Sequence, residues 1–122
     1  MKPKILVVDD EWSMQELLRQ TLSLAGFEVL IAANHLEFKE QAFLHSPDVM
    51  IVDIMLGEKD GAQIYHQLLA EGLSPDIPVV FLSALASGIT PTPPQPGRKF
   101  ALIGKPFDPN QLVRELEKVV KT

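Results

Sequence analysis

The chain has 122 residues, the length of one typical domain, and its 46% hydrophobic and 22% charged residues are ordinary for a globular protein. The absence of cysteine excludes disulfides and thiolate metal sites, and a net charge of −5 argues against a nucleic-acid partner. No apolar stretch is long enough to span a bilayer. The N-terminal segment reaches two acids too early for a secretory signal peptide. We therefore expect one domain over residues 1–122, in the cytoplasm, with no membrane partner.

Short apolar runs rich in β-branched residues alternate with amphipathic helical patterns along the chain. Residues 4–8 (KILVV) are typical of a strand that is buried on both faces. Apolar residues then recur at helical spacing from 14 to 25, and Gly26 follows where a helix commonly ends. Residues 28–32 (EVLIA) predict the second strand.

The second predicted helix begins at Asn34, which resembles a capping box together with Glu37, and it ends near His45 before Pro47. This helix carries the apolar residues Leu36, Phe38, Ala42 and Phe43.

The third predicted strand, residues 49–52 (VMIV), ends in Asp53. Gly57 and Gly61 bracket a turn, and a third helix follows and closes near Gly72. Residues 79–82 (VVFL) predict the fourth strand, which ends in Ser83.

Residues 90–97 interrupt the alternation, because four prolines crowd this stretch and no helix interior tolerates that density. We expect the fourth helix to be lost or irregular. The PTPPQP sequence has spacings that could suit a polyproline-binding partner, although a local loop is favoured. Residues 100–103 predict a fifth strand, and Asp108 with Pro109 begins the last helix.

This order indicates βαβ units, and therefore a doubly wound α/β fold with a five-stranded parallel sheet covered on both faces. Sheets of this kind bind ligands at the carboxyl ends of their strands. Five polar residues stand at those ends and are expected to converge: Asp9, Asp10, Asp53, Ser83 and Lys105.

Three clustered carboxylates repel one another, so their convergence calls for a cation. Carboxylate oxygens without Cys or His favour a hard cation, and a small number of protein ligands with room for water favours Mg²⁺. A nucleophilic Asp53 beside Mg²⁺ is suited to accepting a phosphoryl group as an aspartyl phosphate. Ser83 and Lys105 would donate hydrogen bonds to the phosphoryl oxygens during the transfer.

Five segments, in order and on the expected elements, resemble the receiver domains of response regulators in two-component phosphorelay signalling. They are VVDDE (7–11), VDIML (52–56), DG (60–61), LSA (82–84) and GKPF (104–107). The resemblance covers essentially the whole chain and implies a single receiver domain. It also implies a flavodoxin-like fold with strand order 2-1-3-4-5.

The resemblance implies a role for each residue of the acidic cluster. Asp53 matches the phosphoacceptor and Asp10 the direct Mg²⁺ ligand. Asp9 matches the acid that holds the ion through water, and the backbone carbonyl of Met55 matches a further ligand.

Outside the acids, the resemblance implies that Lys105 pairs with the phosphoryl group and that the Lys105–Pro106 bond is cis. Ser83 matches the switch residue that follows the phosphoryl group. Leu102 stands where the family usually has the aromatic partner of this switch, and Phe100 is the nearest aromatic residue. The standard relay from the site to an output surface is therefore expected to be altered.

The expected function is a signalling switch. A histidine kinase or phosphotransfer protein supplies the phosphoryl group, and phosphorylated Asp53 changes an interaction with a downstream output protein or domain. The reaction is self-catalysed and turns over no metabolite, so the chain is not expected to be an enzyme.

Three alternative functions are each disfavoured by a feature of the sequence. A degenerate receiver that acts as a phosphorylation-independent interaction module is disfavoured by the presence of Asp53 and Lys105. A flavodoxin-type carrier would need a phosphate-binding loop where residues 9–12 (DDEW) stand. A haloacid-dehalogenase-type phosphatase would need an acid in place of Met55.

Overall fold

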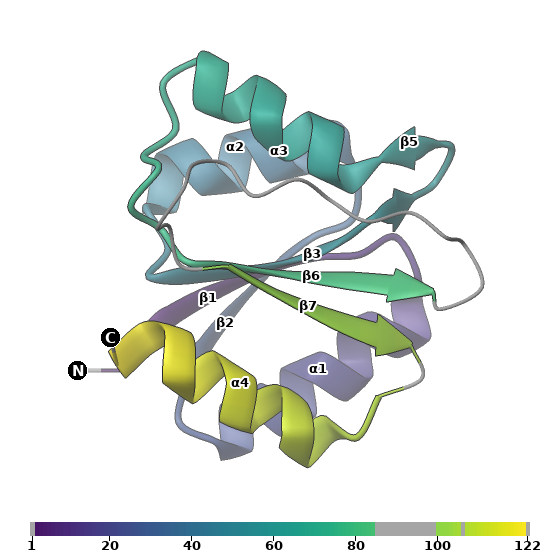
Figure 1. Cartoon of the computed structure of the whole chain (residues 1–122), viewed down its shortest axis with the longest axis vertical. Coiled ribbons are helices and arrows are strands. Elements are labelled where there is room, and N and C mark those ends of the chain that lie inside the picture. Colours follow the sequence, from purple (N-terminus) through teal and green to yellow (C-terminus); the bar gives the residue numbers. More distant parts are fainter. Residues whose placement is uncertain (1, 85–99, 106, 122) are drawn as a thin grey trace.

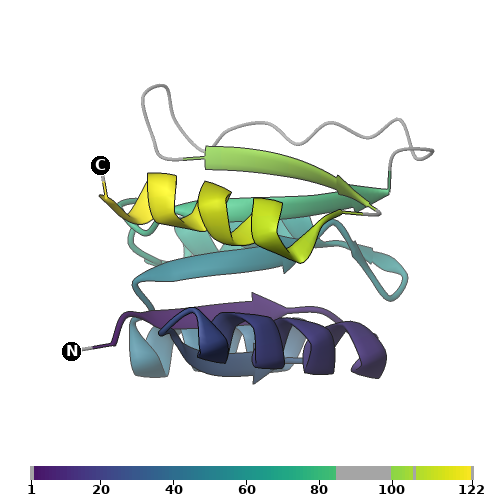
Figure 2. The ribbon, with the colours of Figure 1, turned by 90° about the horizontal axis from the view of Figure 1, so that it is seen from below.

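The computed structural model describes residues 2–84, 100–105 and 107–121, and within them a five-stranded parallel sheet forms the centre of the molecule. Its strands are β1 (Lys4–Val8), β2 (Glu28–Ala32), β3 (Val49–Asp53), β6 (Val79–Ala84) and β7 (Phe100–Lys105). The helices are α1 (Trp12–Leu24), α2 (His35–His45), α3 (Gly61–Ala70) and α4 (Pro109–Lys121). Helices α2 and α3 cover one face of the sheet, and α1 and α4 cover the other (Figures 1 and 2).

The strand order is β2-β1-β3-β6-β7, and every neighbouring pair is parallel. Counted along the predicted strands, this is the order 2-1-3-4-5. The predicted fold class, a doubly wound flavodoxin-like α/β sheet, is therefore confirmed. The assignment of residues 1–122 to one domain stays a prediction.

Alternate residues of each inner strand enter two separate cores, because successive side chains of a strand point to opposite faces. In β1, Ile5 and Val7 pack towards α1 and α4, whereas Leu6 and Val8 pack towards α2 and α3. All four are fully buried, so the run is apolar without alternation, as expected for a central parallel strand.

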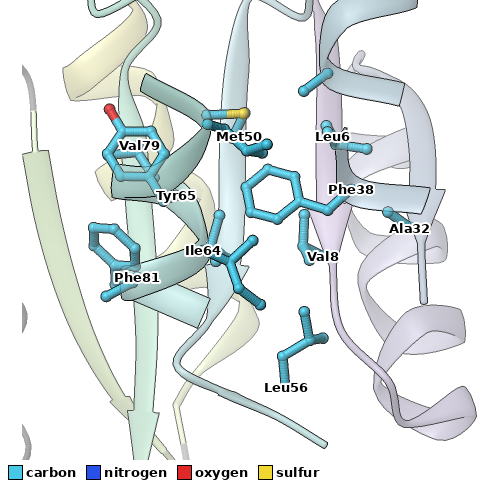
Figure 3. Packing of buried hydrophobic residues seen from close by; sticks show 14 of the residues in the cluster. Leu6, Val8, Ala32, Phe38, Met50, Leu56, Ile64, Tyr65, Val79 and Phe81 are labelled. Atoms are coloured by element: carbon cyan, nitrogen blue, oxygen red, sulfur yellow. The ribbon is translucent and has the colours of Figure 1, made fainter. Parts of the chain in front are cut away.

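The core beneath α2 and α3 contains three buried aromatic side chains, those of Phe38, Tyr65 and Phe81 (Figure 3). Tyr65 packs edge-to-face on Phe81, with ring centroids 5.6 Å apart. Phe38 of α2 is fully buried in the same cluster. These contacts hold α2 and α3 against the sheet and so set where the loops at its carboxyl edge can lie.

The expected capping box of α2 is present. The side chain of Asn34 accepts a hydrogen bond of 2.9 Å from the Glu37 amide, and Glu37 in turn accepts one of 2.8 Å from the amide of Ala33. Of the apolar residues of α2, Phe38 and Ala42 are buried against the sheet, whereas Leu36 is 73% exposed and Phe43 is 40% exposed.

Asp108 begins α4 as predicted, since its carboxylate accepts a hydrogen bond of 2.9 Å from Asn110 N. The last two strands are longer than predicted. Ser83 lies within β6, where it pairs with Gly104 of β7, and Lys105 is the last residue of β7. The strand pairing thus continues through residues that the sequence pattern placed just beyond the strands.

A short hairpin that the sequence did not predict as strand follows β3. It consists of β4 (Met55–Leu56) and β5 (Lys59–Asp60), which pair in antiparallel register. Gly57 in its turn has φ +63°, a conformation that glycine adopts without strain. The hairpin leads directly into α3, where Asp60 caps the helix by accepting hydrogen bonds from the amides of residues 62 and 63.

The predicted loss of the fourth helix concerns residues 85–99, which lie outside the described residues, as does the PTPPQP sequence. In the part of the chain that is described, no helix has the length and apolar character needed to cross a membrane.

Candidate functional site

The strand register brings the predicted acids to one edge of the sheet. Val8 of β1 pairs with Val52 of β3, so Asp9 and Asp53 are the next residues on two neighbouring strands. Asp53 pairs in turn with Leu82 of β6, which places Ser83 one residue further along the next strand. The arrowheads of β6 and β7 in Figure 1 mark this edge.

The carboxylates of Asp9, Asp10 and Asp53 form one cluster, in which an oxygen from each lies within 4.8 Å of the others. Asp9 is fully buried and Asp53 is 3% exposed, whereas Asp10 is exposed. Burying carboxylates side by side is unfavourable unless positive charge compensates them. The cluster therefore has the composition and geometry of a cation site that opens to solvent on the side of Asp10.

Asp9 is held by its backbone and its side chain. Its amide donates a 3.1 Å hydrogen bond to the carbonyl of Ala32, which extends the pairing of β1 with β2 by one residue. Its Oδ1 accepts a 2.9 Å hydrogen bond from the amide of Glu11. Its carbonyl oxygen accepts a 2.7 Å hydrogen bond from Gln15 Nε2. The loop between β1 and α1 is thus built around Asp9.

Asp53 is oriented by the turn that follows it. Its Oδ1 accepts a 3.0 Å hydrogen bond from the amide of Met55. The Ile54 amide donates to the carbonyl of Leu82 at 2.9 Å, and the Ile54 carbonyl accepts from the Gly61 amide at 2.7 Å. These backbone bonds tie β3 to β6 on one side and to the start of α3 on the other.

Gly61 is required by this close approach. A Cβ atom built at residue 61 would lie 2.0 Å from the carbonyl oxygen of Asp53, a separation that real structures do not show. Only glycine lets the first turn of α3 lie directly against the backbone of the predicted phosphoacceptor. Neither Gly61 nor Gln15 had a predicted role in the site, because each acts through a backbone contact that spacing along the sequence does not reveal.

Ser83 and Lys105, the other two residues with predicted catalytic roles, lie on β6 and β7 at the same edge of the sheet. Ser83 is 6% exposed and lies one strand away from Asp53. The backbone of Lys105 lies at the end of the next strand, β7, opposite Ala84. The Lys105 side chain and the Lys105–Pro106 bond are not among the parts of the chain that the structure describes. The predicted catalytic roles of Ser83 and Lys105 stay predictions.

Leu102, at the predicted switch place, is 41% exposed on β7, which is an edge strand of the sheet. The side chain of Phe100 lies outside the described residues. Met55, whose backbone carbonyl is the further predicted metal ligand, is the first residue of β4 and its side chain is half exposed. The ligand and switch roles stay predictions.

Trp12 begins α1 close to the acids and is 72% exposed. An exposed indole two residues from Asp10 is a natural reporter of changes at the cluster.

Known proteins of one class have the same fold as this chain. The sequence profile of the response regulator receiver domain matches residues 5–117. The phosphate regulon transcriptional regulatory protein PhoB of Pseudomonas aeruginosa is 31% identical over 117 residues, which cover 96% of this chain and 51% of PhoB. The chain spans about half the length of the curated relatives it matches.

Two solved structures show the same fold. Chemotaxis protein CheY4 of Vibrio cholerae matches with a TM-score of 0.80 and 26% identity, covering 98% of this chain and 99% of CheY4. The receiver domain of the sensor histidine kinase PA1611 of Pseudomonas aeruginosa, solved with magnesium coordinated in its active-site cleft, matches with a TM-score of 0.85 and 21% identity over all of both chains. The chain belongs to the response regulator receiver domain family of two-component signalling systems.

Proposed function

We propose that Asp53 accepts a phosphoryl group from the phosphohistidine of a histidine kinase or phosphotransfer protein. The observation that carries this proposal is the environment of its carboxylate. It is nearly buried, oriented through Oδ1 by the amide of Met55, and grouped with the carboxylates of Asp9 and Asp10. A buried nucleophile that shares its site with two further acids is suited to a cation-assisted transfer.

In the proposed step, a carboxylate oxygen of Asp53 forms a bond to phosphorus while the bond between phosphorus and the donor's imidazole nitrogen breaks. The imidazole leaves, is protonated from solvent and departs with its protein, and an acyl phosphate remains on Asp53. Because Oδ1 accepts the Met55 amide at 3.0 Å, we expect Oδ2 to be the attacking atom. One donor phosphoryl group is consumed for each chain, so the chain is a self-catalysed acceptor rather than an enzyme.

Receiver domains bind Mg²⁺ at their acidic site, and the donor set of this chain fits that ion. The three carboxylates offer oxygen ligands within 4.8 Å of one another, which is the chemistry that Mg²⁺ prefers. Asp10 and Asp53 would hold the ion directly, Asp9 through water, and the carbonyl of Met55 would complete the protein ligands. When bound, Mg²⁺ supplies positive charge that offsets the carboxylates and the phosphoryl oxygens.

Ser83 and Lys105 are proposed to donate hydrogen bonds to the phosphoryl oxygens. Ser83 lies on β6, the strand next to β3, and Lys105 ends β7, the strand beyond it. The movement of Ser83 towards the phosphoryl group would be the start of the switch. Leu102 is exposed on the edge strand, so we expect the downstream protein or domain to detect a change along β7. The reaction is proposed to occur in the cytoplasm.

Acetyl phosphate, a small phosphoryl donor, tests the proposal without knowledge of the kinase. The chain is incubated with acetyl phosphate with and without Mg²⁺, and the intact mass is measured. We expect one added phosphoryl group that needs Mg²⁺ and is lost in Asp53→Asn. The control is Asp76→Asn, an exposed acid before β6, which should be phosphorylated like the parent. Equal phosphorylation of Asp53→Asn and the parent would contradict the proposal.

A further inference from the structure

Gln15 lies in the first turn of α1, and its side chain reaches back to the loop that carries the two N-terminal acids. Its Nε2 donates a 2.7 Å hydrogen bond to the carbonyl oxygen of Asp9. We propose that Gln15 is a positioning residue for the metal site, because it sets the direction in which Asp10 presents its carboxylate. The inference rests on the proposed function, since it concerns the Mg²⁺ affinity of that site.

The carbonyl that Gln15 holds belongs to the peptide group between Asp9 and Asp10. A peptide group is planar, so fixing the direction of its oxygen restricts ψ of Asp9 and φ of Asp10 together. Asp9 has other anchors, since its amide donates to Ala32 and its Oδ1 accepts from the Glu11 amide. The hydrogen bond from Gln15 adds the restraint on the peptide that leads to Asp10.

Asp10 has no such anchors of its own. Its side chain is exposed, and among the described residues no hydrogen bond or ion pair holds its carboxylate. The charges of Asp9 and Asp53, within 4.8 Å, favour its movement out into solvent. The Gln15 bond and the bond from the Glu11 amide to Asp9 Oδ1 therefore restrain the backbone on the two sides of Asp10 and keep its carboxylate in the cluster. Without the Gln15 hydrogen bond, Asp10 is less ordered before the ion binds. Its ordering then has to occur during binding, and this cost weakens the affinity for Mg²⁺.

A purely structural role for Gln15 makes a different prediction. If Gln15 only satisfies a loop carbonyl, its loss lowers the free energy of unfolding but leaves the Mg²⁺ affinity of the folded protein unchanged. If Gln15 positions Asp10, the affinity falls in the folded protein whatever happens to stability. Magnesium affinity and stability must therefore be measured separately on the same variants.

The test substitutes Gln15→Met, which keeps the length of the side chain and removes the donor. Gln20→Met is the matched control, since Gln20 is exposed on the same helix. Mg²⁺ alone is titrated into the full chain while the fluorescence of Trp12 is followed, and urea unfolding is measured without the ion. We expect Gln15→Met to raise the Mg²⁺ dissociation constant about three- to tenfold, within the range that the loss of one hydrogen bond produces. Gln20→Met should bind like the parent.

Amide hydrogen exchange gives a second readout in the absence of metal. The Glu11 amide is held by Asp9 Oδ1, so a loosened loop in Gln15→Met should speed its exchange, and Gln20→Met should not. Should Gln15→Met fail to fold, Gln15→Asn is one methylene too short to reach the carbonyl and carries the same prediction.

The outcomes separate this inference from the proposed function. If the parent binds Mg²⁺ and Gln15→Met binds it equally well, the positioning role is overturned and the proposed function stands. If the parent binds no Mg²⁺, the proposed metal site and this inference are overturned together. Weaker binding in Gln15→Met with parent-like binding in Gln20→Met supports the inference.

Discussion

Replacing Gly61 by alanine should destabilise the fold although alanine is the better helix former. The added Cβ would lie 2.0 Å from the carbonyl oxygen of Asp53, a backbone atom that cannot rotate away. The helical preference for alanine returns at most about 1 kcal/mol. Overpacking costs about 1–3 kcal/mol, and weakening the 2.7 Å hydrogen bond from Gly61 N to the Ile54 carbonyl costs about 1 kcal/mol more.

The expected net loss is about 2 kcal/mol, which for a chain of 122 residues lowers Tm by about 8 °C. Urea unfolding of Gly61→Ala and the parent, followed by circular dichroism, measures the loss. Gln63→Ala, an exposed position in the same turn of α3, is the control and should stay within about 0.5 kcal/mol of the parent. A Gly61→Ala variant as stable as the parent would refute the argument, because it would show that the Asp53 backbone shifts freely.

Three further predictions concern single side chains. Asp10→Asn should raise the Mg²⁺ dissociation constant about tenfold or more in a Trp12 fluorescence titration, and unchanged binding would remove Asp10 from the ligands. Asn34→Ala should cost about 1 kcal/mol in urea unfolding, since Asn34 caps α2 through a 2.9 Å bond; a neutral effect would contradict the capping role. Lys39 lies 2.7 Å from Glu71, and this hydrogen bond lowers the pKa of Glu71. The stabilisation is therefore present above the unfolded pKa and is lost as pH falls through the lowered folded value. Stability curves for the parent and Glu71→Gln should converge in acid, and parallel curves at every pH would contradict the sign.

The alternation of apolar runs and helical patterns predicts a parallel sheet covered on both faces, because βαβ units connect in a right-handed sense. The strand order is not encoded by this periodicity and follows from the resemblance to receiver domains. The acids could be predicted from the alternation. Each stands at the end of a strand or within two residues of it, and the carboxyl ends of parallel strands meet at one edge of the sheet. The cluster of Asp9, Asp10 and Asp53 therefore followed from counting along the chain.

Other features depend on contacts that periodicity does not encode. The β4–β5 hairpin has two residues in each strand, too few for any alternating pattern to show. Leu36 and Phe38 are both apolar, but Leu36 is 73% exposed and Phe38 is fully buried, a difference that residue type does not encode. The fit of Gly61 against Asp53 and the bond from Gln15 to Asp9 join residues whose spacing carries no helical or strand signal.

Mapping the phosphoryl group to a residue tests the central claim most directly. The chain is phosphorylated with acetyl phosphate and Mg²⁺, digested, and the modified peptide is sequenced by tandem mass spectrometry. The account predicts modification at Asp53 alone, because its carboxylate is nearly buried, oriented by Met55 and grouped with the two other acids. Modification of Asp9 or Asp10 in the wild-type chain, with Asp53 unmodified, would contradict it.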